Sequence, residues 1–279
     1  MQLFGLVKKN AQLSRLRDAC QTLSSQEWEE LYLSHARGER HDIVPFPDAS
    51  TQELTNNLNG EKTAISAIQI LNCMMRSVGE IREPVRGMRV LDYGCGWGRM
   101  TRLLPFYFDP QAIVGVDVDE HLIRSAKTLV PCIKHSRIKN LQALPFKDGS
   151  FDLVLANSVF SHLSELACKY AFAQISRVLS PGGTFVFSAL GRPQLDKFYS
   201  NKLQRSWIEN ILGSREDAIT TLNQQSFVWG ATNRWDQYGI AIAEPLWLRQ
   251  RLDEVGIEYV SVDRSEDAGT HNYITGLKR

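Results

Sequence analysis

The central part of the chain alternates short apolar runs with amphipathic segments. The runs have the length of strands, and the segments between them carry apolar residues at helical spacing. This order is typical of βαβ units, whose parallel strands are buried between helices. The runs cover residues 89–92, 112–117, 133–139, 151–156, 184–188, 257–263 and 272–278. Because the last two runs are close enough to pair antiparallel at a sheet edge, we predict an α/β fold with a doubly wound, seven-stranded mixed sheet whose last strand is antiparallel.

The two regions outside this alternation follow other patterns. Apolar residues recur at helical spacing up to about residue 80, with a break at "HDIVPFPDAS". Residues 191–243 are polar and rich in aromatic side chains, and they follow the fifth run, beside the edge of an open α/β sheet where ligands bind. We therefore predict an N-terminal helical cap over residues 1–80 and an α/β domain over 81–279, in which 191–243 is an insert that covers the substrate.

Composition and charge exclude several classes of protein. The 279 residues include 43% hydrophobic ones, enough for a substantial core, and no stretch approaches the length of an uninterrupted apolar membrane span. Lys and Arg number 32 against 31 Asp and Glu, so no global field attracts nucleic acid or an acidic membrane. The five cysteines have no metal-site spacing. We expect a cytoplasmic protein with reduced thiols, no membrane insertion, no nucleic-acid partner and no metal.

The segment "VLDYGCGWGRM" places three glycines at alternate positions between a strand and a helix. Glycine there lets a ligand approach the backbone closely. A dinucleotide fingerprint needs a further glycine where this chain has Arg99. Asp92, which precedes Gly94, Gly96 and Gly98, would disfavour a pyrophosphate and favour a cationic group. The turn therefore predicts a ligand that carries an ammonium group.

A second carboxylate ends the next strand. Asp117 lies 23 residues beyond Gly94, and an acid about 20 residues after such a turn binds the two hydroxyls of a ribose in dinucleotide folds. Asp117 therefore predicts a nucleoside without identifying which one.

Four segments together resemble one enzyme family. "VLDYGCGWGR", "VGVDVDEHLIRSAK", "LPFKDGSFDLVLANSVFSHL" and "RVLSPGGTFVFS" occur in the order and at the separations found in class I S-adenosylmethionine-dependent methyltransferases, and they cover residues 90–188. The resemblance implies a Rossmann-like fold, methyltransferase activity and S-adenosylmethionine as the cofactor.

The resemblance also implies where the cofactor binds. Its methionine end would lie along the glycine turn, its ribose at Asp117 and its adenine against Val118. Where the family commonly has an acid at the adenine edge, this chain has Asn140, whose amide can still pair with adenine. The cofactor-binding residues predicted in this way are Asp92, Tyr93, Gly94, Cys95, Gly96, Asp117, Val118, Asn140, Leu141, Asn157 and Ser158. Since no histidine is near Cys95 in the sequence, we expect backbone contact there and not nucleophilic catalysis.

Two histidines are candidates for a general base. Transfer of a methyl group to an alcohol needs a base, and histidine titrates near neutral pH. His162 follows the fourth strand in "VFSHLSE", and His271 precedes the last strand in "GTHNYITG". Both stay open as the catalytic residue.

The acceptor is predicted from weaker signals. Trp229, Trp235, Asp236 and Tyr238 lie in the insert and are candidate substrate-binding residues as a group, although for each aromatic alone packing is the favoured explanation. The segments "DYGCGWGRMTRLL", "NSVFSHLSE" and "YGIAIAEPLW" resemble bacterial methyltransferases of glycan and surface-polysaccharide synthesis. This resemblance implies O-methylation of a sugar, a glycan or another small hydroxylated acceptor. The alternatives are an N-methyltransferase of a small metabolite and a protein that binds S-adenosylmethionine without catalysis.

Overall fold

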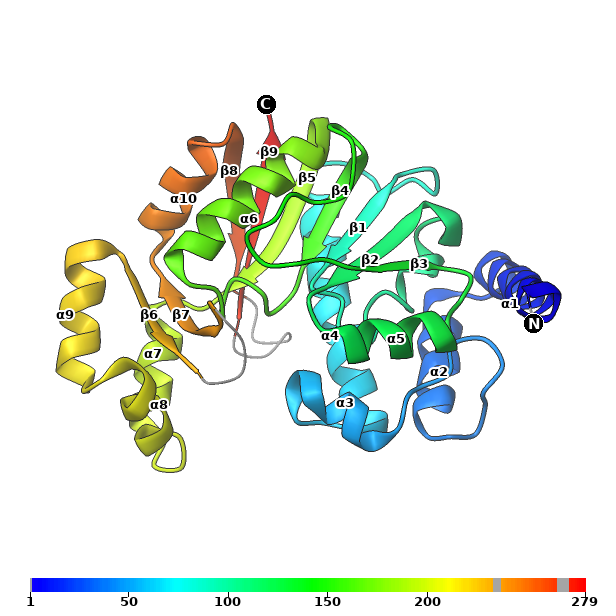
Figure 1. The fold of residues 1–279 in the computed structure, drawn as a ribbon, viewed down its shortest axis with the longest axis horizontal. Coiled ribbons are helices and arrows are strands. Elements are labelled where there is room, and N and C mark those ends of the chain that lie inside the picture. The colour runs from blue at the N-terminus through cyan, green and yellow to red at the C-terminus, as the bar shows by residue number, and fades with distance from the viewer. Residues whose placement is uncertain (1, 233–236, 265–270) are drawn as a thin grey trace. The chain divides into compact units, whose positions relative to one another are not determined.

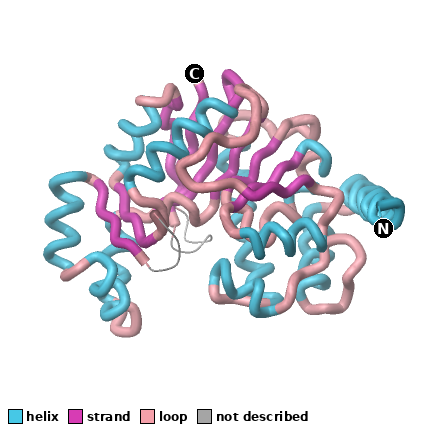
Figure 2. The backbone as a smooth tube through the Cα atoms, viewed as in Figure 1, coloured by secondary structure: helices cyan, strands magenta, loops and turns pink. Residues whose placement is uncertain are grey.

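A mixed sheet forms the centre of the fold. The computed structural model describes residues 2–232, 237–264 and 271–279. The strand order of the sheet is β3-β2-β1-β4-β5-β9-β8, and β6 and β7 form a separate hairpin (Figures 1 and 2). The last strand, β9, pairs antiparallel with both β5 and β8. The predicted seven-stranded mixed sheet with an antiparallel last strand is therefore confirmed.

The chain divides into two compact units, Met1–Lys139 and Asn140–Arg279, and each is described by itself. The described elements of the first unit are α1 (Gln2–Thr22), α2 (Ser25–Ala36), α3 (Ala49–Asn56), α4 (Gly60–Gly79), β1 (Val90–Tyr93), η1 (Leu104–Phe106), η2 (Pro110–Ala112), β2 (Ile113–Asp117), α5 (Glu120–Leu129) and β3 (Lys134–Arg137). Strands β1, β2 and β3 pair in parallel, so that their carboxyl ends lie at one edge.

Local chemistry explains where the helices of the first unit begin. Helix α2 has a capping box, in which the Ser24 side chain accepts from the backbone of Glu27 and the Glu27 side chain accepts from the backbone of Ser24. Asp48 caps α3 through its bond to the Thr51 amide, and Asp119 caps α5. These caps set the residues at which α3 and α5 begin.

The described elements of the second unit are β4 (Phe151–Ala156), α6 (Glu165–Val178), β5 (Leu179–Ala189), α7 (Arg192–Ser200), α8 (Arg205–Leu212), α9 (Arg215–Gln225), β6 (Phe227–Ala231), β7 (Gly239–Ala243), α10 (Pro245–Asp253), β8 (Ile257–Asp263) and β9 (Asn272–Lys278). The parallel pairing of β4 with β5 shifts register between Phe151 and Leu153, where the segment "SPGG" of β5 forms a bulge. Gly182 in that bulge has a φ of +71°, which favours glycine.

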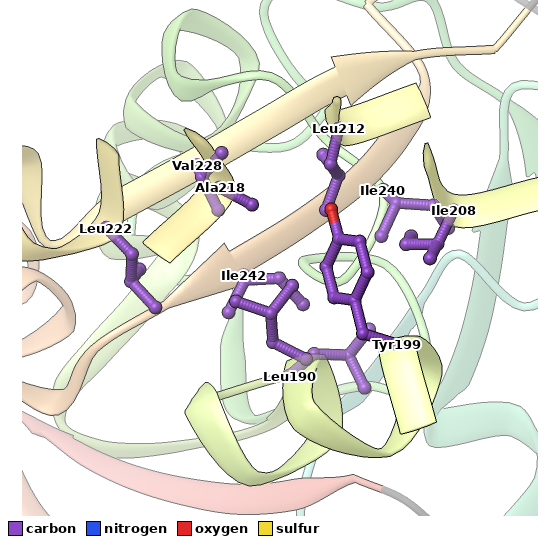
Figure 3. Packing of buried hydrophobic residues seen from close by; sticks show 10 residues of the cluster. Leu190, Tyr199, Ile208, Leu212, Ala218, Leu222, Val228, Ile240 and Ile242 are labelled. Carbon is purple, nitrogen blue, oxygen red and sulfur yellow. The ribbon is translucent and has the colours of Figure 1, made fainter. Parts of the chain in front are cut away.

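Residues 191–243 build a small core of their own within the second unit. Helices α7, α8 and α9 gather around the β6–β7 hairpin in Figure 1, and Figure 3 shows the apolar side chains between them. The buried members of this cluster are Leu190, Leu195, Tyr199, Ile208, Leu212, Ala218, Leu222, Val228, Ile240 and Ile242. The hairpin therefore rests on a packed support. The predicted boundaries at residues 80, 191 and 243 stay predictions.

No helix among the described residues is long and apolar enough to cross a membrane. The same part of the chain holds no group of three or more His, Cys, Asp and Glu side chains that could bind a metal ion.

Candidate functional site

The glycine turn follows β1 in the first unit and is tied to β2. The amides of Gly94 and Cys95 both donate to the carbonyl of Val116, at 2.8 and 2.9 Å. Gly96 has a φ of +56°, and a Cβ atom there would lie 2.9 Å from Cγ2 of Thr55. The backbone at Gly96 is thus one that a side chain would strain and crowd.

Asp117 links the turn to the start of α5. One carboxylate oxygen accepts from the amide of Gly96 at 2.8 Å, and the other accepts from the amide of Asp119 at 2.9 Å. Burial raises the pKa of Asp117, against these backbone hydrogen bonds, which lower it. Each oxygen has more than one lone pair. The carboxylate is therefore held in a fixed orientation and can still accept from the two hydroxyls of a diol.

Asp92 lies below the same turn and is only 1% exposed. Its Oδ2 atom accepts from Thr101 Oγ1 at 2.5 Å, while its buried Oδ1 atom has no hydrogen-bond partner among the described residues. Burial raises the pKa of Asp92 to about 6, although the bond from Thr101 lowers it and Asp117 adds to the increase. A buried carboxylate oxygen without a donor fits a cationic ligand, as the sequence predicted.

Helices from the N-terminal part of the first unit pack directly on the turn. Trp97, which is fully buried, donates through its indole N–H to Oγ1 of Thr55 on α3 at 3.2 Å. The hydroxyl of Tyr32 on α2 donates to the carbonyl of Arg99 at 2.6 Å. These contacts tie the glycine turn to α2 and α3.

The remaining predicted positions of the first unit have simpler surroundings. Cys95 is buried, and burial raises the pKa of its thiol well above the ordinary value. A neutral buried thiol is a poor nucleophile, in line with the expected backbone role. Tyr93 and Val118 are half-buried at the carboxyl ends of β1 and β2. Together, the orphaned Oδ1 atom of Asp92, the glycine turn and Asp117 fit the methionine and ribose parts of S-adenosylmethionine.

We expect the substitution Asp117→Ala to weaken binding of S-adenosylhomocysteine by roughly 10- to 100-fold. The substitution removes the acceptor of the ribose hydroxyls, and this range corresponds to a net loss of about one charge-assisted hydrogen bond, worth about 1.5–3 kcal/mol. Calorimetric titration measures the affinity. The matched control is Asp119→Ala, which removes a cap of α5 beside Asp117; its affinity should stay within about threefold of the unchanged protein, because a cap contributes about 1 kcal/mol to the helix and not to the ligand. Equal affinities for the two variants would show that the ribose binds elsewhere.

In the second unit, predicted residues gather after β4. Asn157 is buried, and its side-chain oxygen accepts from the hydroxyl of Tyr273 at 3.3 Å. Ser158 has a φ of +56°, and its amide donates to Oγ of Ser188 at 2.6 Å. Leu141 also has a positive φ, of +54°, and it is exposed, whereas its neighbour Asn140 is half-buried.

His162 lies four residues after Ser158 and is held by the hairpin. Its Nδ1 atom is 2.8 Å from the carbonyl oxygen of Gly239, and its Nε2 atom is 3.3 Å from Oγ of Ser158. A carbonyl can only accept, so Nδ1 carries the proton in the neutral ring. Nε2 is then the basic nitrogen, and it faces a hydroxyl group. The partners of the ring thus select the tautomer that a general base requires.

Two of the predicted substrate-binding aromatics contact this histidine. The ring of Tyr238 stacks on the imidazole, with centroids 4.7 Å apart and planes 14° apart. The indole N–H of Trp229 donates to the carbonyl of His162 at 3.2 Å. Both side chains therefore hold His162 in place, which gives them a role beside any contact with substrate. Trp235 and Asp236 lie outside the described residues.

His271 stands at the start of β9. It is half-buried, and the next residue, Asn272, pairs with Ala189 at the carboxyl end of β5. Its side chain makes contacts of its own. Its predicted role as a base stays a prediction.

A hollow of about 580 Å³ opens along α7 in the same unit. Its lining combines neutral polar side chains with one aromatic ring and one cation: Gln194, Lys197, Phe198, Ser200, Asn201 and Gln204. The ring of Phe198 meets that of Trp207 edge to face at 6.0 Å, and Trp207 is 44% exposed. A volume of this size suits a small molecule.

Several contributors to the site had no usable signal in the sequence. Gly239 and Thr55 act through contacts with residues far away in the chain, while Thr101 contacts Asp92, nine residues before it. Hydrogen bonds of this kind leave no local pattern.

Known proteins share the central part of this chain. A sequence profile described as a methyltransferase domain matches residues 91–187. An O-methyltransferase of Penicillium expansum is 32% identical over 163 residues, which are 53% of this chain and 58% of that protein. A malonyl-[acyl-carrier protein] O-methyltransferase of Legionella pneumophila is 31% identical over 121 residues, 43% of this chain and 40% of that protein. The chain thus spans about half the length of these curated relatives.

Solved structures share the fold. An S-adenosylmethionine-dependent methyltransferase from Mesorhizobium loti superposes with a TM-score of 0.50 at 18% identity, covering 73% of this chain and 96% of that one. Magnesium protoporphyrin IX methyltransferase from Synechocystis, solved with bound S-adenosylhomocysteine, gives 0.51 at 13% identity, covering 78% and 87%. At such identities the likeness concerns the fold alone. Residues 91–187 thus match a methyltransferase domain, with the four motifs in register inside a fold that this chain shares with S-adenosylmethionine-dependent methyltransferases, and S-adenosylmethionine is its cofactor.

Proposed function

We propose that the protein methylates a hydroxyl group of a sugar, a glycan or another small polyol, with His162 as the general base. The observation that carries the proposal is the pair of hydrogen bonds that fixes the imidazole, from Nδ1 to the carbonyl of Gly239 and at Nε2 to Oγ of Ser158. A ring held by both nitrogens, half-buried after the carboxyl end of a strand, is arranged to accept a proton.

The need for a base distinguishes among acceptors. An alcohol is a weak nucleophile until its proton leaves, so that a base lowers the barrier of transfer to oxygen. A carboxylate is already ionised at neutral pH, and a deprotonated amine is already nucleophilic. The prepared His162 therefore favours an alcohol over both. Relatives from Penicillium expansum and Legionella pneumophila are named as O-methyltransferases, which supports an oxygen acceptor.

Bound S-adenosylmethionine supplies an activated methyl group on a sulfonium, whose sulfur leaves with the bonding electrons. The chain's own residues orient the reactants and move one proton. Asp92 would face the ammonium of the cofactor and Asp117 its ribose, while His162 would take the proton of the acceptor hydroxyl. Positioning of this kind accounts for a large part of many enzymatic rate accelerations.

The hollow along α7 supports a neutral, hydroxylated acceptor. The amides of Asn201 and Gln204 and the hydroxyl of Ser200 can pair with sugar hydroxyls, and the ring of Phe198 offers an apolar face. Among the described residues, Lys197 is the one charged side chain of the lining. Such a lining favours a sugar or polyol over a strongly anionic acceptor.

A labelled donor tests the proposal directly. The protein is incubated with S-adenosylmethionine carrying a ¹³C methyl group and three acceptor sets: methyl glycosides with nucleotide sugars, a malonyl thioester, and aliphatic amines. We expect a methyl ether with a member of the first set, identified by the carbon shift of the new methyl group. A product that is only a methyl ester or an N-methyl amine would contradict the proposal. So would the absence of any transfer by protein that binds S-adenosylhomocysteine.

A further inference from the structure

We propose that Ser158 is a further catalytic residue, whose hydroxyl relays the proton of the acceptor to Nε2 of His162. The inference rests on the proposed function and adds the path of the proton. Ser158 is one of the predicted cofactor-binding residues, but cofactor binding does not by itself explain why a serine with a left-handed backbone lies directly beside His162.

The backbone of Ser158 is unusual for its residue type. Its φ of +56° lies in the region that glycine and asparagine adopt easily and that costs other residues about 1 kcal/mol or more. The chain holds it there through the 2.6 Å hydrogen bond from its amide to Oγ of Ser188, a side chain with no exposed surface. Strain that is maintained by a buried partner at the end of a strand is a reason to look for function.

This conformation places the serine hydroxyl at the histidine. Oγ of Ser158 is 3.3 Å from Nε2, the nitrogen that has no proton in the neutral tautomer, so the hydroxyl donates to it. The far side of the ring is anchored by the hairpin, since the carbonyl of Gly239 accepts from Nδ1 and the amide of Gly239 donates to the carbonyl of His162 at 2.7 Å. A half-buried hydroxyl with a base behind it can still accept a hydrogen bond from a molecule in front.

In the proposed step, one methyl group and two protons move. The acceptor oxygen forms a bond to the methyl carbon as the bond from that carbon to sulfur breaks, and sulfur keeps the electron pair. The acceptor's proton passes to Oγ of Ser158 while the serine's own proton passes to Nε2 of His162. The products are a methyl ether, a thioether and a protonated His162, which later releases its proton to water.

The substitution Ser158→Gly separates this role from a structural one. Glycine adopts a φ of +56° without strain, so the variant should unfold at an equal or higher temperature than the unchanged protein. The matched control is Ser226→Gly. Ser226 has a φ of +57° at the end of α9, and its amide bonds within that helix, so its replacement relieves the same kind of strain away from His162.

The rates of these variants are measured with a methyl glycoside that the unchanged protein methylates. We expect Ser158→Gly to lower kcat by roughly 10- to 100-fold, less than most of the roughly 10²- to 10⁴-fold range of general acid–base contributions because the base itself remains, while its affinity for S-adenosylhomocysteine is unchanged. The rate of the unchanged protein should fall nonlinearly with the deuterium content of the solvent, because two protons move, and that of Ser158→Gly should fall linearly. Ser226→Gly should keep the rate and the curvature.

Two results would overturn the relay. One is a kcat for Ser158→Gly within about threefold of the unchanged protein, well below the general acid–base range. The other is an unchanged ¹⁵N shift of His162 Nε2 in Ser158→Gly, which would show that no hydrogen bond from Ser158 existed. The shift is measured without a methyl acceptor. A full rate in a variant without the imidazole of His162 would instead refute the proposed function, so the two failures are distinguishable.

Discussion

Replacing His162 by asparagine should lower kcat for a glycoside acceptor by about 10²- to 10⁴-fold. Asparagine is the sharpest choice because its amide N–H can still donate to the carbonyl of Gly239, which now accepts from Nδ1 at 2.8 Å. The variant therefore keeps the anchor to the hairpin and loses only the basic nitrogen. Binding of S-adenosylhomocysteine, followed by calorimetry, should be unchanged.

The pH dependence of the rate gives a second readout. A protonated imidazole cannot accept a proton, so the unchanged protein should lose activity on the acid side as His162 becomes charged. In His162→Asn this loss should disappear, and the residual rate should rise with hydroxide concentration instead.

The matched control for this prediction is His271→Asn. It should keep both the rate and the acid limb of the pH profile, because the hydrogen bonds that prepare a base are those of His162. The opposite outcome, loss in His271→Asn and retention in His162→Asn, would transfer the role to His271. Retention in both variants would mean that no base is needed, as for an amine or a carboxylate.

The strands were predictable because each carries its own signal. The apolar run at 151–156 coincides with β4, and the predicted strand at 112–117 begins one residue before β2. Their boundaries follow from apolar composition and from the polar residues that end them. The fifth strand was predicted too short, since β5 begins at Leu179 and includes the glycine-rich bulge that the predicted run at 184–188 leaves out. A bulge and a turn share the same residues, so composition alone does not separate them.

The insert was less legible for a physical reason. Its three helices and hairpin are stabilised by contacts among themselves, such as Tyr199 on α7 with Gly213 after α8, and not by strong local periodicity. The sequence indicated that aromatic residues there concern the substrate. The structure shows a nearer partner for two of them, because Trp229 and Tyr238 hold the loop and ring of His162. Such roles depend on long-range pairing, which single-sequence patterns do not record.

Among the buried titratable groups of the first unit, His135 and Asp92 have opposing effects on stability. His135 on β3 is 5% exposed, and burial, with a further contribution from the charge of Arg102, lowers its pKa to about 3. Asp92 has its pKa raised to about 6. Below the ordinary histidine pKa of about 6.5, this histidine binds a proton in the unfolded chain but not in the fold. Falling pH therefore destabilises the fold through His135. Below about 6, folded Asp92 takes up a proton that the unfolded chain does not yet bind, so falling pH stabilises the fold.

Replacing His135 by leucine should therefore change the slope of stability against pH. Between pH 7 and pH 5 the histidine costs the unchanged protein about 2 kcal/mol of unfolding free energy, and by pH 4 about 3 kcal/mol, at roughly 1.4 kcal/mol per pKa unit. Asp92 offsets about 1 kcal/mol of this by pH 5. Urea unfolding at pH 7, 5 and 4 measures the free energy of unfolding of both proteins. The value for His135→Leu, relative to that of the unchanged protein, should increase as the pH falls, whatever the cost of repacking at pH 7.

The complementary variant is Asp92→Asn, in which falling pH should cost more stability than in the unchanged protein. Its amide keeps an oxygen for the hydrogen bond from Thr101, so packing is disturbed little and the titration is removed. Parallel curves for the unchanged protein and His135→Leu would mean that the histidine becomes protonated within the fold, through water that reaches β3. Divergence in the predicted directions for both variants would show that buried His135 and Asp92 act in opposite directions on the stability of this unit as the pH falls, and that the effect of His135 exceeds the roughly 1 kcal/mol of a single surface ion pair.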